Sequence, residues 1–164
     1  METPATVSQL LETIQRAREE WNALLEPIDQ PNMTLPGVAG DWSLKDIIAH
    51  ITWHERQMVG LIKAHALVGS DLWNLPTDER NAVIYDEVKD LPLEQVLKES
   101  DEVYAQLLEV LPSLGDDDLV NPEGFPNMPP DWQPGNIIAQ NTFEHYQQHI
   151  PDAQRWITES GSAP

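Results

Sequence analysis

Residues 43–62 read SLKDIIAHITWHERQMVGLI and carry the plainest structural signal in the chain. Ser43 followed three residues later by Asp46 has the form of a capping box, which opens a helix. Apolar residues then return at helical spacing, at Ile47, Ile51, Met58, Leu61 and Ile62. The stretch therefore predicts an amphipathic helix, which we expect to run over residues 43–68 with one face in a core.

Three other segments show the same periodicity, and we expect helices over residues 6–28, 92–111 and 134–158. Pro92 and Pro134 stand where proline is favoured, in the first turn of a helix. Pro151 falls inside the last segment and predicts a kink or local break there. A weaker pattern over residues 69–90 predicts a short helix within a connection.

No alternating run and no Asn-Gly or Asp-Gly turn predicts a β-strand. Four amphipathic helices bury their apolar faces most simply as an all-α, antiparallel up-down four-helix bundle. Its connections are long, and the proline-rich stretch 112–134 is of a length that is usually functional or mobile. The 164 residues fit one domain, residues 1–164.

Charge and cysteine content narrow the function. Nine Lys and Arg against 28 Asp and Glu give a net charge of −19, which repels nucleic acid and anionic lipid, so we expect neither as a partner. No uninterrupted apolar stretch approaches about 18 residues, and no signal peptide is evident. The absence of cysteine excludes disulfides and thiolate ligands. We therefore expect a soluble, cytoplasmic protein.

Histidine placement is the informative feature. Four of the five histidines form two pairs at i, i+4 spacing, His50 with His54 and His145 with His149. This spacing puts both rings of a pair on one helix face, as in zinc-binding helices. The fifth, His65, is unpaired, and we expect it to be an ordinary polar residue.

Both histidine pairs face the predicted core. The helical period places the second pair on the side of Ile138 and Trp156, and the first pair within or beside the apolar stripe of residues 43–68. An unpartnered imidazole is costly there, whereas a metal would satisfy it, and bundles commonly build metal sites from facing helices. The alternative is that each histidine is an ordinary hydrogen-bonded side chain at a helix border.

Two segments resemble a known family. Residues 40–55, GDWSLKDIIAHITWHE, resemble the second-helix motif of the DinB-like four-helix bundles. They are most similar to the ClbS/DfsB branch, in which a Trp-Ser/Thr-x-Lys-Asp opening precedes Ala-His and a downstream Glu. Residues 144–149, EHYQQH, resemble the fourth-helix His-x-x-x-His of the superfamily. The resemblance covers most of the chain in helix order and implies a DinB-like fold.

The resemblance also implies a metal site. By position, His50, His145 and His149 would hold a divalent ion, with zinc or nickel as the natural candidates. Three neutral imidazoles leave open coordination positions, which can activate water or polarise a substrate. His54 lies outside the family pattern, and is left either as a hydrogen-bond donor to the site or as a fourth ligand.

The family's activities imply two kinds of function. One is a protective hydrolase, because ring-opening hydrolysis of a genotoxin is the best-known activity of the ClbS/DfsB branch. The other is a transferase that uses a low-molecular-weight thiol as cosubstrate. Both would act on a small electrophilic compound with a bound metal. The alternative from a different class is a metal-free protein that binds or sequesters a small molecule, as a monomer or a homodimer.

Other side chains near the histidines are candidates for roles in the site. Glu55 and Glu144 adjoin the histidine pairs and are candidate catalytic proton acceptors, although acidic neighbours are expected anywhere in so acidic a chain. Trp42, Trp53 and Trp132 are candidate walls of a substrate pocket, with ordinary core packing as the alternative.

Overall fold

The computed structural model describes residues 4–161, which exclude the first and last three residues of the predicted domain. Within that range the chain forms α-helices and short 3-10 helices and no strand, so the predicted all-α bundle is confirmed. The α-helices are α1 (Val7–Leu25), α2 (Leu44–Ala64), α3 (Thr77–Val88), α4 (Leu93–Val110), α5 (Pro134–Gln140) and α6 (Phe143–Ser160). The 3-10 helices are η1 (Gln30–Thr34), η2 (Asp71–Asn74), η3 (Leu111–Ser113), η4 (Asp116–Leu119) and η5 (Pro122–Gly124).

The ends of α2 follow from local hydrogen bonding. The Ser43 hydroxyl accepts from the Asp46 amide at 3.2 Å, and the Asp46 carboxylate accepts from the Ser43 amide at 2.9 Å, which completes the capping box. The helix ends at Ala64 because His65 takes the left-handed conformation, with φ 47°, as its C-cap. The helix is thus four residues shorter than residues 43–68 would make it at that end.

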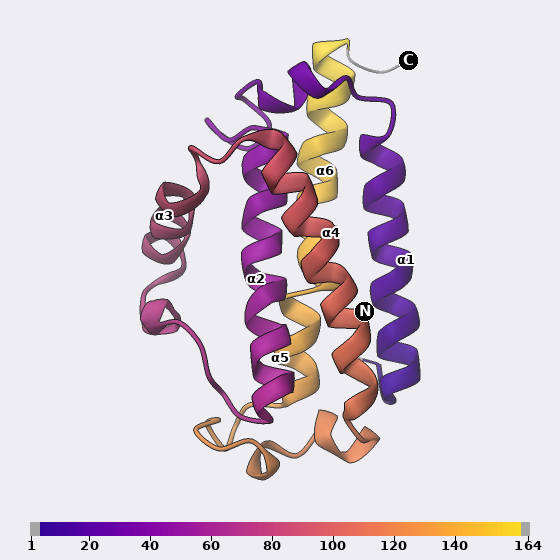
Figure 1. The fold of residues 1–164 in the computed structure, drawn as a ribbon, viewed down its shortest axis with the longest axis vertical. Coiled ribbons are helices and arrows are strands. Elements are labelled where there is room, and N and C mark those ends of the chain that lie inside the picture. Colours follow the sequence, from indigo (N-terminus) through magenta and orange to yellow (C-terminus); the bar gives the residue numbers. More distant parts are fainter. Residues whose placement is uncertain (1–3, 162–164) are drawn as a thin grey trace.

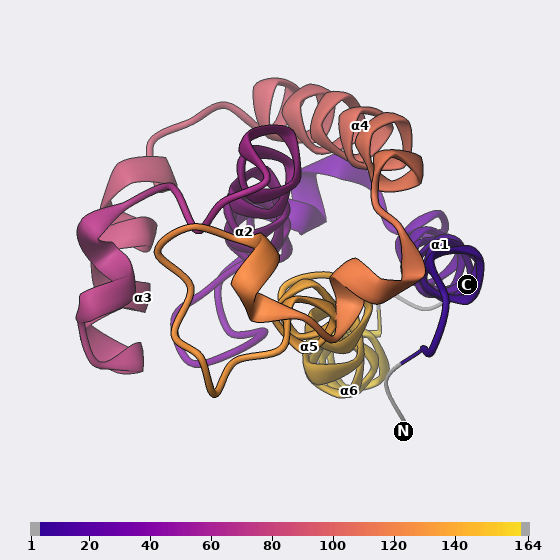
Figure 2. The same cartoon turned by 90° about the horizontal axis from the view of Figure 1, so that it is seen from below.

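Four helical positions surround one core. Figure 2 shows α1, α2, α4 and the α5–α6 pair almost end-on around it, with α3 outside, beside α2. The most extensive packing joins α2 to α4 and α1 to α6. The core between them is apolar, with side chains such as Trp21, Ile47 and Phe143 almost completely buried.

The helix directions differ from strict alternation at one step. In Figure 1, α2 and α4 run the same way, and α1 and α6 run the other way. Lys45, at the start of α2, donates to the carbonyl oxygens of Lys89 and Leu91, just before α4, and Arg56 further along α2 pairs with Glu99 of α4. The two helices are parallel because α3 carries the chain back along the outside of the bundle before α4 begins.

The last helical segment is divided at a place the sequence does not mark. The single helix expected over 134–158 is two helices, because Thr142 leaves the helical conformation at φ −131°, ψ −104°. Its hydroxyl donates to the carbonyl of Ile138 at 2.6 Å. Pro151, where a kink was predicted, lies inside α6 without ending it.

The long connection between α4 and α5 covers one end of the bundle. It inserts Phe125, 1% exposed, and Met128 into the core, and the Phe125 ring stacks on His65 with ring centres 4.3 Å apart. Among residues 4–161, no helix combines the length and the apolar character needed to cross a lipid bilayer.

Candidate metal centre

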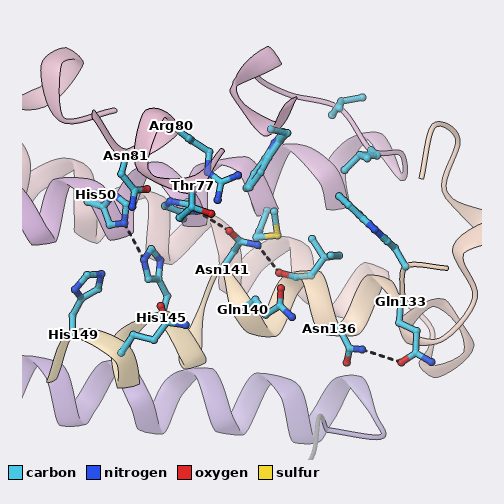
Figure 3. Close-up of a pocket in the computed structure, with 18 of the residues that line it drawn as sticks. His50, Thr77, Arg80, Asn81, Gln133, Asn136, Gln140, Asn141, His145 and His149 are labelled. Carbon is cyan, nitrogen blue, oxygen red and sulfur yellow. Dashed lines mark hydrogen bonds between the residues drawn. The ribbon is translucent and has the colours of Figure 1, made fainter. Parts of the chain in front are cut away.

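A cavity of about 680 Å³ opens between α2, α3 and the α5–α6 pair. This volume lies in the range of small-molecule sites. Figure 3 shows its residues, with Arg80 and Asn81 reaching in from α3, His50 from α2, and His145 and His149 from α6. Much of the remaining wall is made of amide side chains: Gln133, Asn136, Gln140, Asn141 and Gln148.

The histidine cluster, His50, His54, His145 and His149, lies at the inner wall of this cavity. The first three are at most 6% exposed, and His149 is half-buried. The Nε2 atoms of His50 and His145 are 3.0 Å apart, so one ring donates to the other (Figure 3). Ring centres within the cluster are 4.5–5.5 Å apart, which joins the two i, i+4 pairs into one group.

Asn141 fixes the tautomer of His54. Its side-chain oxygen accepts from His54 Nδ1 at 2.7 Å, and its amide nitrogen donates to the Ile137 carbonyl at 2.8 Å, which orients the amide. A neutral imidazole with its proton on Nδ1 has a free lone pair on Nε2. This Nε2 atom is buried and has no hydrogen-bond partner in the protein.

Three of the histidines fit a divalent metal ion. Atoms that can act as ligands on His50, His145 and His149 all lie within 4.8 Å of one another. The 3.0 Å between two of the Nε2 atoms is close to the separation of about 3.3 Å expected for two nitrogens on one tetrahedral zinc. Nδ1 of His50 and of His145 has no protein partner either, so the protein itself leaves the cluster incompletely satisfied.

Burial keeps these rings neutral. It lowers the pKa of His50 to about 2 and that of His54 to about 4, and it also lowers the pKa of His145 and of His149. The positive charge of Arg80 lowers the pKa of the first three further. Metal ligation requires neutral imidazole, so the cluster holds its ligating form at neutral pH.

Arg80, from α3, also lines the cavity. Its guanidinium lies over the Trp73 ring, 5.1 Å from the ring centre, and the Trp73 ring is 5.8 Å from the His54 ring. The Arg80 Nε atom is buried and has no hydrogen-bond partner. A cation is thereby held next to the neutral histidine cluster.

The structure places Glu55 away from the cavity, contrary to expectation. Its carboxylate is completely buried and accepts from the Tyr146 hydroxyl at 2.7 Å. Arg18 donates to the Tyr146 oxygen and to Ser100, each at 2.9 Å, and pairs with Asp101 at 2.9 Å. We call these five residues the arginine network. Burial raises the pKa of Glu55 to about 7, although the Tyr146 hydrogen bond and the Arg18 charge oppose the shift.

Of the remaining predicted site residues, some line the cavity and others do not. Glu144 is half-buried on α6 and does not line the cavity, whereas Trp132 does. Trp42 packs edge-on against His50 and stacks on Tyr85 of α3, with ring centres 5.1 and 5.5 Å away. Trp53 packs against His54 at 5.0 Å. These two tryptophans therefore support the histidines from outside the cavity.

Sequence reasoning missed Arg80, Trp73 and Asn141. The first two lie in residues 69–90, where the helical pattern is weak and supplies no face on which to place them. Asn141 could have been found from its position four residues before His145, on the same helix side. An asparagine there is an obvious partner for an inward imidazole.

The fold and the site together define a helical bundle with an inward histidine cluster beside a ligand-sized cavity. The family model of the DinB superfamily matches residues 13–152. The chain therefore belongs to the DinB superfamily, as its sequence predicted. No curated protein matches the chain.

Several solved structures share the fold. An uncharacterised protein from Escherichia coli UTI89 is 18% identical with a TM-score of 0.76, over 99% of this chain and 98% of the other. The colibactin self-resistance protein ClbS is 14% identical with a TM-score of 0.77, over 94% and 96%. The sibling lethal factor precursor DfsB is 18% identical with a TM-score of 0.76, over 96% and 98%. Two of these neighbours thus belong to the branch that residues 40–55 resemble.

The prediction that nucleic acid is excluded as a partner is wrong. The ClbS structure was solved in complex with double-stranded DNA, so a DinB-like bundle of this kind does not exclude nucleic acid as a partner. The error lies in the use of net charge. A charge of −19 sets the long-range field around the molecule, whereas contact with a duplex depends on the local patch that meets it.

Proposed function

We propose that this protein is a metal-dependent enzyme that acts on a small electrophilic compound. The observation that supports this is the convergence of His50, His145 and His149 from two helices, with their ligating atoms within 4.8 Å of one another. They meet at the wall of a cavity of about 680 Å³, which has room for a small substrate beside the ion.

The chain's own residues would divide the work. The three histidines would hold the ion, and zinc or nickel suits imidazole ligands. When bound, the ion would lower the pKa of a coordinated water or low-molecular-weight thiol and so supply the nucleophile. His54 presents the free Nε2 lone pair, which can accept a hydrogen bond or a proton from a molecule in the cavity. Glu55 and Glu144 receive no such role, because neither lines the cavity.

A protective role is consistent with one neighbour. ClbS is a self-resistance protein. We extend to this chain only the general idea that the cavity receives a reactive small molecule and removes its reactivity. A hydrolase would use water for this step and a transferase would use a thiol.

A second candidate function is favoured by a specific contact. His50 and His145 are within hydrogen-bonding distance, at 3.0 Å, so the pair can be stable without a metal. In that case the histidines shape the polar wall of a cavity that binds or sequesters its ligand. The two functions differ in whether the native protein holds a metal.

Elemental analysis of protein expressed without an affinity tag separates them. We expect about one divalent ion per chain in the wild type and none in the triple variant His50→Ala, His145→Ala, His149→Ala. His65→Ala is the matched control, since His65 lies outside the cluster and should leave the metal content unchanged. Metal that is absent from the wild type after zinc or nickel is supplied, or that persists in the triple variant, contradicts the proposal.

Thermal unfolding and turnover extend the test. A ligand that binds only the native state at about 100 times its Kd adds about 2.7 kcal/mol, so chelator should lower the melting temperature of the wild type and of His65→Ala, but not of the triple variant. Reactive electrophiles should then be screened with metal-loaded protein, with and without added thiols. Consumption that requires the thiol identifies a transferase, and consumption without it identifies a hydrolase.

A further inference from the structure

The cations of this chain are distributed unevenly. All nine Lys and Arg lie in the described residues, and six of them form ion pairs with carboxylates. Of the three that do not, Arg16 and Lys63 are exposed to solvent. Arg80 is the third, and it is half-buried in the wall of the cavity. In a chain with 28 acidic residues, an arginine without a carboxylate partner at such a position is unusual.

The surroundings of Arg80 favour an external anion. Its guanidinium is held over the Trp73 ring at 5.1 Å, which fixes the group by a cation–π contact but satisfies none of its N–H donors. Its Nε atom is buried without a partner. Asp131 is the one carboxylate among the residues that line the cavity, and it forms no ion pair with Arg80. Arg80 lines the cavity, so its terminal N–H donors are open to a molecule inside it, although Nε itself is buried.

The position of Arg80 links it to the proposed reaction. Trp73 contacts both groups: the Arg80 guanidinium lies 5.1 Å from its ring centre and the His54 ring centre lies 5.8 Å from it, so the cation stands near the histidine cluster. Both groups line the same cavity (Figure 3). A ligand that meets both must present an acceptor group at one end and its reactive centre at the other.

We propose that Arg80 binds an anionic group, a carboxylate or a phosphate, of the ligand that enters this cavity, and so selects acidic small molecules. This inference rests on the proposed function for the identity of the cavity as a reaction site, but the anion preference is a property of the metal-free protein. The planar guanidinium offers parallel N–H donors to either group.

Matched probe pairs test the preference in chelator-treated protein. Benzoate and benzamide differ in charge at nearly constant shape, and phenyl phosphate against phenol provides the phosphate arm. Binding is followed by the side-chain NMR signal of the Trp73 indole. We expect at least one anion to bind roughly tenfold or more tightly than its neutral partner. The arm that shows the larger ratio identifies the acidic group.

Variants assign that preference to Arg80. Arg80→Gln should reduce the ratio to about one, and Arg80→Lys should retain part of it because the charge remains without the planar donors. Arg16→Gln, at an exposed cation without an ion pair, is the matched control and should keep the wild-type ratio. Circular dichroism establishes that each variant is folded.

Three results would overturn the proposal: equal binding of both members of each pair, a preference that persists in Arg80→Gln, or no binding of either anion at millimolar concentration. The same titrations with zinc-loaded protein separate this proposal from the previous one. A metal-free wild type that prefers anions through Arg80 supports the anion site even where metal analysis fails. A preference that appears only with zinc and is unaffected by Arg80→Gln belongs to the metal and rejects the role of Arg80.

Discussion

The histidine cluster and the arginine network are two polar groups built on the same pair of helices. His54 and Glu55 are neighbours on α2, and His145 and Tyr146 are neighbours on α6, yet the histidines face the cavity and their neighbours face the core. Successive residues of a helix point about 100° apart, which is enough to separate the two groups.

The two groups differ in how their polar atoms are satisfied. In the arginine network a chain of hydrogen bonds runs from Asp101 through Arg18 and Tyr146 to Glu55. The histidine cluster has one hydrogen bond between two of its rings and one to Asn141. Three of its buried ring nitrogens have no hydrogen-bond partner. Arg18 Nε and Glu55 Oε2 are also buried without a partner, so neither group is fully satisfied. The arginine network links α1, α2, α4 and α6 by hydrogen bonds, whereas the histidine cluster borders a cavity and has capacity for a ligand.

Among single substitutions, the largest expected effect comes from breaking the arginine network. Arg18→Met leaves Glu55 buried without its cation, and removal of one partner of a buried charge pair costs about 3–5 kcal/mol. The free energy of unfolding, measured with urea at pH 8, should fall by that amount. The double variant Arg18→Met, Glu55→Leu should recover much of the loss, since an apolar replacement leaves no buried charge. A single variant as stable as the wild type would show that the network contributes no stability.

The pH should also change the stability, with opposite signs in the two groups. The folded-state pKa of His54 is about 4 against an unfolded value near 6.5, so the unfolded chain takes up more protons and stability falls as the pH drops below about 6.5. This ring alone contributes about 3 kcal/mol, and His50, His145 and His149 act in the same direction.

Glu55 acts the other way in the same experiment. Its folded-state pKa is raised to about 7, so the folded protein holds the extra proton and gains stability as the pH falls from about 7 toward 4.5. Unfolding free energies of metal-free protein from pH 8 to pH 4 should therefore decrease overall, and more steeply in Glu55→Gln. A stability that is constant over this range in both proteins would contradict the shifted pKa values of the histidines and of Glu55.

The smallest effect tests the hydrogen bond between the His54 ring and the Asn141 side chain. Asn141→Leu leaves the His54 Nδ1 proton without its acceptor and should cost about 1–3 kcal/mol. Nitrogen NMR of the His54 ring should show the Nδ1–H tautomer in the wild type and a mixture in the variant. Asn81→Leu, at another amide of the cavity wall, is the control and should leave the His54 tautomer unchanged.

The sequence predicted the bundle and the meeting of the histidine pairs, because both depend on helical period. The family signal in residues 40–55 added which superfamily the bundle belongs to. The sequence predicted less well where residues adjacent along the chain were assumed to point toward the same site. Glu55 was placed beside His54 for that reason, although the two side chains lie on different helix faces.

Other features depend on tertiary contacts that no local pattern encodes. The division between α5 and α6 occurs at Thr142, whose hydroxyl bonds to the preceding turn, while Pro151 is accommodated inside α6. The parallel course of α2 and α4 follows from the outward path of α3. That path also brings Arg80 to the cavity, from a helix whose apolar periodicity is too weak to indicate any orientation.

Because α3 lies outside the bundle, the helices on the two sides of the cavity should differ in local stability. Ile84 is the only fully buried side chain of this helix, whereas most of α2 is buried. Amide hydrogens in α2 should exchange with solvent only when the whole domain unfolds, but those of α3 need only this one helix to detach. The α2 side of the cavity should therefore open only on global unfolding, whereas the α3 side should open more often, by local unfolding of that helix. A ligand held between Arg80 and the histidine cluster would slow exchange in both helices, because neither the form with α3 detached nor the unfolded chain retains the site, and α3 would remain the faster of the two.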